Sequence, residues 1–441
     1  MTLVSHPVRA LRGAVRAPGD KSCSHRALIF GALAEGRSRF AGLLEGDDVR
    51  RTAAAMQALG AELEQSGPGD WAVRGVGAAG FRTPAGPIDF GNSGTGARLI
   101  MGALAGFDLE ADLQGDESLS SRPMARVLDP LRRMGAVSEP ADADRLPFRL
   151  RGRSTLSAID YAPAQASAQV KSAILIAGLR AEGATSATEA KPTRDHTERM
   201  LRGFGVEVSV RRTDAGDTIT VEGGQKLSAI ETALPGDPSS AAFLTAAAII
   251  SPAGEVLIER LMSNDRRDGF YQAAAAMGAH IGAEEAGEAA GERLIDLTAA
   301  AGALRGVALP ERLVPSMIDE FPILAVLAAF AEGETVVSGA EELRVKESDR
   351  VTATVDMLRA CGVEAEERPD GFVVQGCGGP PPGGGLVETR HDHRIAMSAL
   401  VLGTAAEAPV AIDDASMIAT SYPDFADHMR ALGADIRHGA P

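Results

Sequence analysis

Phe204-Gly205-Val206-Glu207-Val208-Ser209-Val210 is the stretch of sequence that decides the fold. Its glycine stands where a helix C-terminus needs a residue in the left-handed conformation, and the alternating residues after it predict a β-strand. The same pattern of helix end, glycine and short alternating run occurs six times along the chain. Its glycines are Gly60, Gly135, Gly205, Gly278, Gly362 and Gly433, spaced 75, 70, 73, 84 and 71 residues apart.

A second type of helix alternates with the first and is almost wholly apolar, so we expect it to be buried. Its six members are 26–34, 97–105, 171–179, 241–250, 322–331 and 394–403. Each unit of roughly 70–80 residues then runs strand-helix-strand-helix-strand-strand. The competing interpretation is two unrelated α/β domains whose helix ends match by chance, and the sixfold recurrence disfavours it.

Six units indicate two lobes of three. The segment Leu234-Pro235-Gly236-Asp237-Pro238 follows the third unit and is rich in residues that break helices and strands. We therefore predict one lobe from residues 1–19 and 237–441 and another from residues 20–236, with the active site in the cleft between them. We also expect the lobes to close about these two crossings when ligands bind.

The composition argues against several classes of protein. A net charge of −16 without a basic tail is unfavourable for polynucleotide binding. The three cysteines, Cys23, Cys361 and Cys377, lack metal-ligand spacing, so we expect no disulfide framework, no metal and no cofactor. The beginning of the chain lacks the apolar segment of a signal peptide, and its apolar stretches are too short to span a bilayer. We therefore expect a monomer in the cytoplasm, without membrane partners.

Basic residues collect where helices are expected to begin. Lysine and arginine oppose the helix dipole there, unless an anion is shared between the cation and the free N–H groups of the helix. For any one of them alone, a solvated surface charge is an equally good interpretation. As a set in an acidic protein, they indicate a multiply anionic ligand. The set comprises Lys21, Arg26, Arg122, Arg194, Lys346, Arg350 and Arg394.

Two carboxylates are candidates for proton transfer, Asp319 and Glu347. Each lies beside an expected helix start, and Glu347 adjoins Lys346. A carboxylate crowded by cations stays ionised and can act as a base, whereas one that shares a proton with a lysine can act as an acid. The alternative for Glu347 is an exposed charge at a helix end. The segment Gly91-Asn92-Ser93-Gly94-Thr95-Gly96 lacks the spacing of a P-loop, but its backbone could approach an anion closely.

These residues resemble a known family, the 5-enolpyruvylshikimate-3-phosphate synthases, over nearly the whole chain. The family's fold is two inside-out α/β lobes, each built from three βαβαββ units, which agrees with the sixfold spacing. The matching segments are Pro18-Gly19-Asp20-Lys21-Ser22 with Ser24-His25-Arg26, Gly91-Asn92 through Thr95 with Arg98, Arg122-Pro123-Met124, Ser167-Ala168-Gln169-Val170-Lys171, 343–350 and Asp392-His393-Arg394-Ile395-Ala396-Met397.

The resemblance implies roles for a set of residues. Asp319 would orient the substrate hydroxyl and act as base, Glu347 would take part in protonating the methylene carbon, and Lys21 would contribute to catalysis. Shikimate 3-phosphate would be held by Lys21, Ser22, Arg26, Ser167, Ala168, Gln169, Arg194, Asp319 and Lys346. Phosphoenolpyruvate would be held by Lys21, Gly94, Arg122, Gln169, Arg350 and Arg394.

The implied reaction belongs to the shikimate pathway, which supplies chorismate for aromatic amino acid biosynthesis. The 5-hydroxyl of shikimate 3-phosphate attacks C2 of phosphoenolpyruvate while C3 gains a proton. The tetrahedral ketal then loses phosphate and a proton from C3. Arginines and helix N-termini would neutralise the anions, so that a weak nucleophile can approach them.

Part of the sequence looks like the branch of the family that often tolerates glyphosate. The segments 19–22, 167–171 and 194–198 carry this likeness. Gly94 departs from it, because tolerant members often have alanine there, and so does the segment Asn264-Asp265-Arg266-Arg267. Thr420 stands where the other branch has a lysine that contacts phosphoenolpyruvate, and we assign it no role. We expect at least partial sensitivity to glyphosate.

Two alternatives remain open at this point. One is the related transferase that puts enolpyruvyl on UDP-N-acetylglucosamine, which normally carries a reactive cysteine in the loop near Arg122. Residues 115–122 contain no cysteine, and Cys23 is interpreted as a small residue at a helix start. The other is a non-catalytic anion-binding protein of the same fold, and the presence of Lys21, Asp319, Glu347 and Arg394 argues against it.

Overall fold

The computed structural model describes residues 2–214 and 216–439, which divide into two compact units. Unit 2 comprises Gly19–Pro235 with Ala289–Glu292, and unit 1 comprises the remainder. The predicted lobes break after residues 19 and 236, whereas the structure assigns Gly19 to unit 2 and Gly236 to unit 1. It also assigns Ala289–Glu292 to unit 2, because this hairpin turn is anchored on side chains of that unit.

The helix ends have the backbone conformation that the sequence predicts. All six repeat glycines have positive φ, from 76° at Gly362 to 116° at Gly135. At Gly205 the φ is 86°, and its N–H donates to the carbonyl of Arg202 at 3.0 Å. The chain thereby leaves α7 (His196–Gly203) and enters β14 (Val208–Thr213).

Unit 2 contains three four-stranded sheets of one design. In each sheet an edge strand is parallel to its neighbour and the other pairs are antiparallel. The first is β16 (Glu231–Ala233), β3 (Arg37–Ala41), β5 (Asp70–Arg74) and β4 (Glu62–Gly67). The second is β6 (Ile88–Asp89), β7 (Glu110–Gln114), β9 (Phe148–Arg151) and β8 (Val137–Glu139). The third is β11 (Asp160–Tyr161), β13 (Ala184–Glu189), β15 (Gly216–Glu222) and β14, and β10 (Leu156–Ser157) pairs separately with β12 (Ala181–Glu182).

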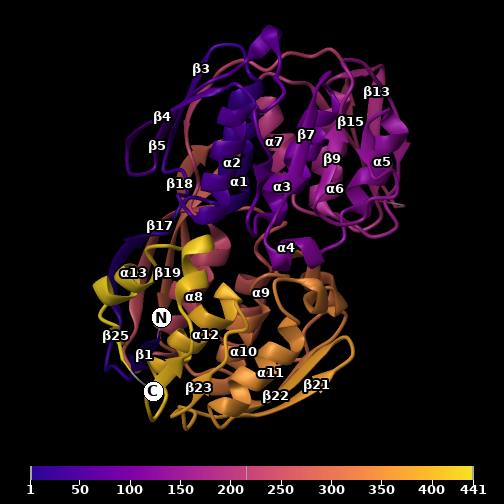
Figure 1. The fold of residues 1–441 in the computed structure, drawn as a ribbon. Helices are drawn as coiled ribbons and strands as arrows, with labels where there is room; N and C mark the ends of the chain where they lie inside the picture. The colour runs from indigo at the N-terminus through magenta and orange to yellow at the C-terminus, as the bar shows by residue number, and fades with distance from the viewer. Residues whose placement is uncertain (1, 215, 440–441) are drawn as a thin grey trace. The chain divides into compact units, whose positions relative to one another are not determined.

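The helices of unit 2 are of the two expected types. The buried ones are α1 (Lys21–Leu33), α3 (Gly94–Ala105) and α6 (Ala168–Gly178), of which α3 and α6 pack against each other (Figure 1). The more polar ones are α2 (Asp47–Ala58), α5 (Ala125–Met134) and α7, with the short α4 (Glu117–Ser121) and the 3₁₀ turn η1 (Gly77–Ala79) between them.

Among the described residues, unit 1 has two four-stranded sheets and one three-stranded sheet. The N-terminal strand β1 (Leu3–His6) pairs with the C-terminal strand β25 (Asp435–His438), so both termini belong to one sheet (Figure 1). That sheet is completed by β24 (Val410–Ile412) and β23 (Leu386–Val387). The others are β18 (His280–Ala289), β19 (Glu292–Ala300), β17 (Glu255–Ser263) and β2 (Arg12–Arg16), and β20 (Glu332–Val337), β22 (Gly371–Cys377) and β21 (Glu364–Arg368).

The core of unit 1 is built around three apolar helices, α8 (Pro238–Ile250), α10 (Phe321–Phe330) and α12 (His393–Gly403). Every residue of α10 is buried, as its sequence FPILAVLAAF requires. The remaining helices are α9 (Gly269–Ala276), α11 (Arg350–Ala360) and α13 (Phe425–Ala431), with the 3₁₀ turns η2 (Glu311–Ser316), η3 (Glu341–Val345) and η4 (Ser416–Thr420). No helix among the described residues is both long and apolar enough to cross a membrane.

The buried helices begin earlier than the apolar stretches predict, because polar caps extend them. Asp20 caps α1 by accepting from the N–H of Cys23 at 2.7 Å, so Lys21 lies in the first turn rather than before it. Ser93 caps α3 and Ser167 caps α6 in the same way. Several of the predicted site residues therefore occupy the first turns of buried helices, where the free N–H groups lie.

Candidate active site

In unit 1, Arg350 joins the two carboxylates that the sequence singles out for proton transfer. Its side chain is completely buried at the start of α11. NH1 contacts Oδ1 of Asp319 at 3.2 Å, and NH2 contacts Oε2 of Glu347 at 2.6 Å. Nε donates to Oδ2 of Asp392 at 2.8 Å, and NH2 also donates to Oδ1 at 3.3 Å. These contacts account for four of the five N–H donors of a guanidinium.

The charges of this cluster are fixed by one another. Burial disfavours the charged form of Arg350, but the attraction of Asp392, Glu347 and Asp319 outweighs it and raises the pKa above the usual value. Burial likewise disfavours the Asp392 carboxylate, and the Arg350 guanidinium outweighs it and lowers that pKa. Arg350 therefore stays cationic while it holds Asp319 and Glu347, which are 18% and 22% exposed, in place.

Asp392 was assigned no role from the sequence, although it stands in a segment that carries the family resemblance. In the structure it is the N-cap of α12, accepting from the N–H of Arg394 at 2.9 Å and from the hydroxyl of Ser348 at 3.0 Å. It thereby connects the loop that carries Glu347 with the helix that carries Arg394. The sequence signal was an aspartate before a buried helix, which is indistinguishable from an ordinary cap.

The other two predicted residues of unit 1 differ in their surroundings. Arg394 is 7% exposed in the first turn of α12, and no described group accepts a hydrogen bond from its Nε. A buried guanidinium with an unused donor is suited to receive an anionic ligand. Lys346 is instead paired with Oε1 of Glu342 at 2.8 Å, so the structure does not bring it into the Arg350 cluster.

In unit 2, the Gly-rich segment, Arg122 and Gln169 come together. Gln169 donates through Nε2 to Oγ1 of Thr95 at 2.9 Å, and its Oε1 accepts from NH1 of Arg98 at 3.0 Å. A Cβ placed on Gly94 would lie 2.9 Å from NH1 of Arg98 and 3.3 Å from NH1 of Arg122. The guanidinium groups of Arg98 and Arg122 therefore both lie close to Gly94.

Arg122 is held by α4 and by the Gly-rich segment. Its NH2 donates to Oδ1 of Asn92 at 2.5 Å and to the hydroxyl of Ser118 at 3.0 Å. Among the described residues, Nε of Arg122 has no acceptor. Asn92 and Arg98 are thus parts of this site to which the sequence assigned no role, because their spacing alone does not show which side chain they meet.

The first turn of α1 carries the remaining candidates of unit 2. Nζ of Lys21 lies 2.9 Å from Oδ2 of Asp48 in α2, and its side chain is 20% exposed. Arg26 is buried deeper and donates to Oγ1 of Thr197 at 2.7 Å, to Oγ of Ser172 at 2.8 Å and to the carbonyl of Ser22 at 2.8 Å. Burial lowers the pKa of Arg26. Arg26 therefore links α1 to the first turns of α6 and α7.

Ser167, Ala168 and Arg194 lie at the starts of those two helices. Ser167 is the N-cap of α6 and accepts from the N–H of Val170 at 3.5 Å, and Ala168 is the first helical residue. Arg194 precedes Asp195, the N-cap residue of α7. Repulsion by Arg194 contributes to the lowered pKa of Arg26, so the two cations are electrostatically close.

One group of described residues meets the distance requirement of a metal site, although the sequence spacing predicts none. Ligand atoms of Cys23, His196 and Glu292 lie within 4.8 Å of one another, and all three residues are buried. Nδ1 of His196 is already 2.8 Å from Oε1 of Glu292, and NH1 of Arg199 is 3.5 Å from Oε2. Burial raises the pKa of Cys23 well above its usual value, which disfavours the thiolate that a metal needs. We therefore interpret the group as an internal cluster in which Glu292 contacts His196 and Arg199.

Two segments to which the sequence assigned no role also have defined contacts. Arg267 is 3% exposed and donates to Oδ1 of Asp237 at 3.0 Å and to the hydroxyl of Ser239 at 2.9 Å, so it fastens the start of α8. Thr420 donates to the carbonyl of Met417 at 2.7 Å and lies 3.5 Å from Nδ1 of His393. Neither contact involves a predicted catalytic carboxylate.

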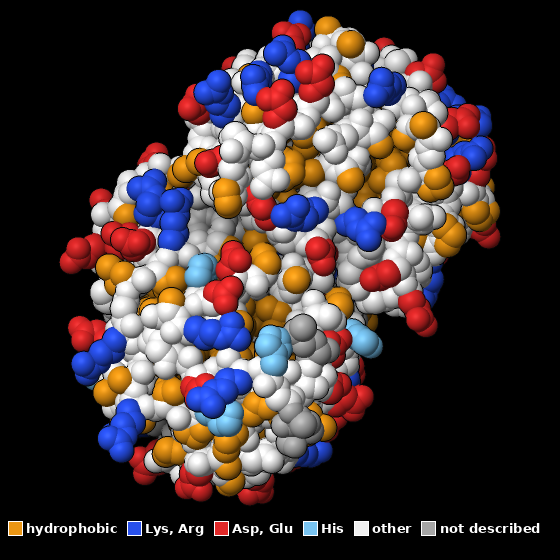
Figure 2. All heavy atoms as spheres, turned by 60° about the vertical axis from the view of Figure 1, so that its left-hand side comes forward, with side chains coloured by type: hydrophobic (Ala, Val, Ile, Leu, Met, Phe, Trp, Pro, Cys, Tyr) orange, Lys and Arg blue, Asp and Glu red, His pale blue; other side chains and the backbone are white. Residues whose placement is uncertain are grey.

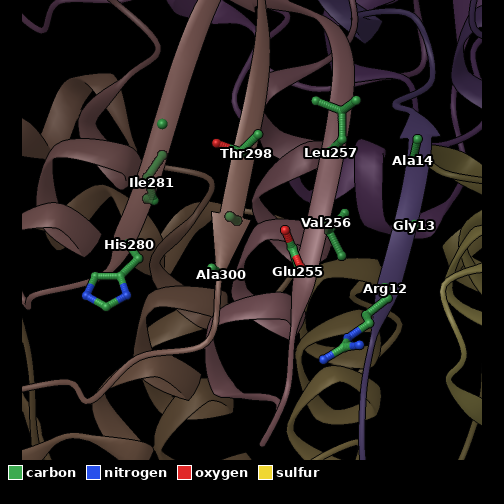
Figure 3. A pocket seen from close by; sticks show the side chains of 12 residues that line it. Arg12, Gly13, Ala14, Glu255, Val256, Leu257, His280, Ile281, Thr298 and Ala300 are labelled. Atoms are coloured by element: carbon green, nitrogen blue, oxygen red, sulfur yellow. The ribbon is translucent and has the colours of Figure 1, made fainter.

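A hollow of about 690 Å³ lies on the face of the sheet formed by β2, β17, β19 and β18 (Figure 3). Its polar side chains include Arg12, Glu255 and His280, and none of the predicted site residues lines it. Basic and acidic side chains are interspersed on the face drawn in Figure 2. The candidate site is therefore marked by specific contacts at helix starts and not by this hollow or by a basic tract on that face.

Known proteins match nearly the whole chain. Residues 5–429 match the family model described as EPSP synthase (3-phosphoshikimate 1-carboxyvinyltransferase). A 3-phosphoshikimate 1-carboxyvinyltransferase of Hyphomonas neptunium is 66% identical over 99% of this chain and 100% of the relative. One from Caulobacter vibrioides is 55% identical over 98% of both chains.

Solved structures confirm the predicted fold class. An EPSP synthase from Acinetobacter baumannii superposes with a TM-score of 0.88 and 39% identity over 100% of both chains. The enolpyruvyl transferase NikO from Streptomyces tendae superposes with a TM-score of 0.76 at 20% identity, over 100% of this chain and 99% of that one. At that identity the second likeness concerns the fold alone.

Proposed function

The chain belongs to the EPSP synthase family, and from this premise we infer that it transfers the enolpyruvyl group of phosphoenolpyruvate to the 5-hydroxyl of 3-phosphoshikimate. Phosphate is the second product, and the reaction belongs to aromatic amino acid biosynthesis. The observation that carries this conclusion is the match to transferases of that name over nearly the whole chain. Neither the UDP-N-acetylglucosamine enzyme nor a non-catalytic binding protein is favoured by these relatives.

We propose that the Arg350 cluster carries out the proton transfers. Asp319 takes the proton of the 5-hydroxyl as its oxygen attacks C2 of phosphoenolpyruvate, and Glu347 takes part in protonating C3. In the second step Glu347, which has given its proton to C3, takes a proton back from C3 as the C2–O bond to phosphate breaks, and the departing phosphate receives the proton held by Asp319. Because Arg350 contacts both carboxylates, its positive charge offsets the repulsion between them while protons move to and from the substrates.

We propose that the cations of unit 2 bind the anionic groups of the substrates. Arg122 has an unused Nε donor beside Gly94, which suits it to the phosphate or carboxylate of phosphoenolpyruvate. Gln169 and the first turn of α3 lie next to it, and Lys21 supplies a further positive charge. Ser22, Arg26, Ser167, Ala168 and Arg194 are proposed to hold 3-phosphoshikimate.

We propose that Asp319 and Lys346 in unit 1 also bind 3-phosphoshikimate, and that Arg350 and Arg394 bind phosphoenolpyruvate. Of these, Arg394 has an unused donor among the described residues, which supports its role. Arg350 has most of its donors committed to carboxylates, so its contribution to phosphoenolpyruvate is expected through charge and through at most one further hydrogen bond. Lys346 would have to leave Glu342 to reach a ligand.

We further propose that the enzyme is at least partly sensitive to glyphosate. The local reason is Gly94, because a Cβ at this position would press on NH1 of Arg98 and of Arg122, whereas glycine leaves both guanidinium groups in place. Resemblance of other segments to the tolerant branch points in the opposite direction, and we weight the local contact more heavily. A monomeric state, a cytoplasmic location and the lack of nucleic-acid and membrane partners remain predictions from composition.

A phosphate-release assay tests the function directly. The purified protein should release phosphate from phosphoenolpyruvate when 3-phosphoshikimate is the acceptor and not when UDP-N-acetylglucosamine is. Release with only the second acceptor would assign the chain to the related transferase. Release with neither acceptor, together with tight binding of 3-phosphoshikimate, would indicate a binding protein of this fold.

A further inference from the structure

The hairpin of β18 and β19 ends in a turn that is packed into unit 2. Ala289–Glu292 belongs to unit 2, whereas the rest of both strands belongs to unit 1. The two turn residues have positive φ, 51° at Ala290 and 78° at Gly291, as in the tight turns that close hairpins. Alanine rarely adopts this conformation, so neighbouring contacts must hold the turn.

Those contacts come from residues far away in the sequence. The N–H of Ala290 donates to Oγ1 of Thr232 at 3.1 Å. NH1 of Arg199 donates to the carbonyl of Gly291 at 3.4 Å, and a Cβ on Gly291 would lie 3.1 Å from the carbonyl oxygen of Arg199. The turn is therefore seated closely against α7.

Glu292, the residue after the turn, places a carboxylate at the start of α7. The side chain is completely buried, and Oε1 is 2.8 Å from Nδ1 of His196. Oε2 is 3.5 Å from NH1 of Arg199, whose Nε donates to Oδ2 of Asp195 at 2.9 Å. A buried carboxylate is unfavourable unless it is well paired. Here the two oxygens of Glu292 contact His196 and Arg199.

The residues that Glu292 contacts lie next to Arg194, which is proposed to bind 3-phosphoshikimate. Arg194 directly precedes Asp195, and Thr197 in the same turn contacts both Arg26 at 2.7 Å and Ser172 at 2.7 Å. The first turn of α7 is thus fixed on one side by the proposed substrate-binding residues and on the other by Glu292. A shift of this turn would move Arg194.

We propose that Glu292 is a positioning residue, which fixes the start of α7 so that Arg194 meets the phosphate of 3-phosphoshikimate. This inference rests on the function proposed above and adds to it a residue that touches no substrate. We expect Glu292 to affect binding of the phosphate most, because Arg199 links Glu292 to Asp195, which directly follows Arg194.

The test removes the negative charge of Glu292 and keeps the size and shape of its side chain. Glu292→Gln is expected to weaken binding of 3-phosphoshikimate by about tenfold, as for other groups that orient a ligand-binding side chain. Binding of shikimate, which lacks the phosphate, should be unchanged, and both affinities can be measured by calorimetry. Glu288→Gln is the matched control, since Glu288 is exposed in the same hairpin and should leave both affinities as they are. Equal weakening of both ligands by Glu292→Gln would show a general structural effect and overturn the proposal.

A double-mutant cycle with Arg194→Gln supplies the second criterion. In the Arg194→Gln background, Glu292→Gln should cause no further loss of 3-phosphoshikimate affinity, whereas additive losses would overturn the proposal. If Glu292→Gln does not fold, as judged by thermal unfolding, Arg199→Gln carries the same test, because it removes the link from Glu292 to Asp195.

The proposed function and this inference fail in different ways. Lack of turnover by the unsubstituted protein and by Glu288→Gln would contradict the function itself. Normal turnover, with weakened phosphate binding in Arg194→Gln but not in Glu292→Gln or Arg199→Gln, would contradict only the role of Glu292.

Discussion

Arg350 is the residue that connects the candidate catalytic carboxylates of unit 1. It is a fully buried cation whose neighbours are three carboxylates, and the energy of each charge depends on the others. Replacing one carboxylate with a neutral side chain therefore changes both the number of protons that the site can exchange and the position of Arg350. Substitutions that preserve shape separate these two effects best.

Asp319→Asn and Glu347→Gln are each expected to lower kcat by roughly a hundredfold or more, as for loss of an acid or base. Binding of 3-phosphoshikimate should stay close to normal, because the side-chain volumes are unchanged. Steady-state kinetics with calorimetry measures both quantities. Glu341→Gln, an exposed neighbour in η3, is the control. Near-normal kcat in Asp319→Asn would remove Asp319 from the mechanism.

Gly94→Ala tests the proposed glyphosate sensitivity. The added methyl group would press on NH1 of Arg98 and of Arg122, at 2.9 and 3.3 Å, and narrow the space beside them. Since glyphosate is longer than phosphoenolpyruvate, its inhibition constant should rise by roughly tenfold or more. The KM for phosphoenolpyruvate should also rise, because Arg122 moves, but by less. Competition kinetics on both proteins decides this, and equal rises in the two constants would contradict it.

At the scale of elements, a buried helix can contain a titratable side chain whose charge state in the folded protein is set by its burial. His25 in α1 is completely buried, with Nδ1 2.8 Å from Oγ1 of Thr52 in α2. Burial, followed by the charges of Lys21 and Arg26, lowers its pKa from 6.5 to about 3. The helix that carries Lys21 thus contains a histidine that is neutral in the folded protein.

This lowered pKa predicts how stability depends on pH. Between pH 6.5 and about 3 the unfolded chain binds a proton at His25 that the folded chain does not. The contribution to stability is therefore complete above pH 6.5 and falls by up to about 1.4 kcal/mol per pH unit below it. His25→Gln should unfold with a shallower pH dependence in this range, as measured by denaturant titration at several pH values. Identical slopes would contradict the assignment.

At the scale of the whole molecule, the chain passes between its units at residues 18–19 and 235–236 and again on either side of Ala289–Glu292. At the first passages the N–H of Asp20 donates to the carbonyl of Pro235 at 2.8 Å, and the N–H of Asp237 donates to that of Pro18 at 2.8 Å. A Cβ on Gly19 would lie 1.9 Å from the carbonyl oxygen of Gly42, so only glycine fits there.

The distribution of proposed ligand-binding cations over both units predicts a response to ligand. Small-angle scattering should give a smaller radius of gyration with saturating 3-phosphoshikimate than without it, because an anion attracts cations of both units. Shikimate at the same concentration is the control, since it lacks the phosphate and should have a smaller effect. An unchanged radius with saturating 3-phosphoshikimate would count against closure.

The sequence by itself determined the repeating architecture, and it predicts most of the residues of the candidate site. Helix-ending glycines such as Gly205 and wholly apolar helices such as α10 are local signals, because backbone conformation and burial are written into each segment. Asp319 and Glu347 are candidates because carboxylates stand beside expected helix starts, and the family resemblance adds the role of each. Helix starts such as Lys21 were placed too late, since a cap and the first turn carry little apolar signal.

Only the tertiary structure decided which of these residues meet. Glu292 lies 96 residues from His196, and Asp392 lies 42 residues from Arg350, so no spacing rule connects them. The contact between Gln169 and Arg98 likewise depends on the packing of α3 against α6. A buried charge is stable only beside its partner, and that partner is chosen by how distant segments pack, which local sequence does not encode.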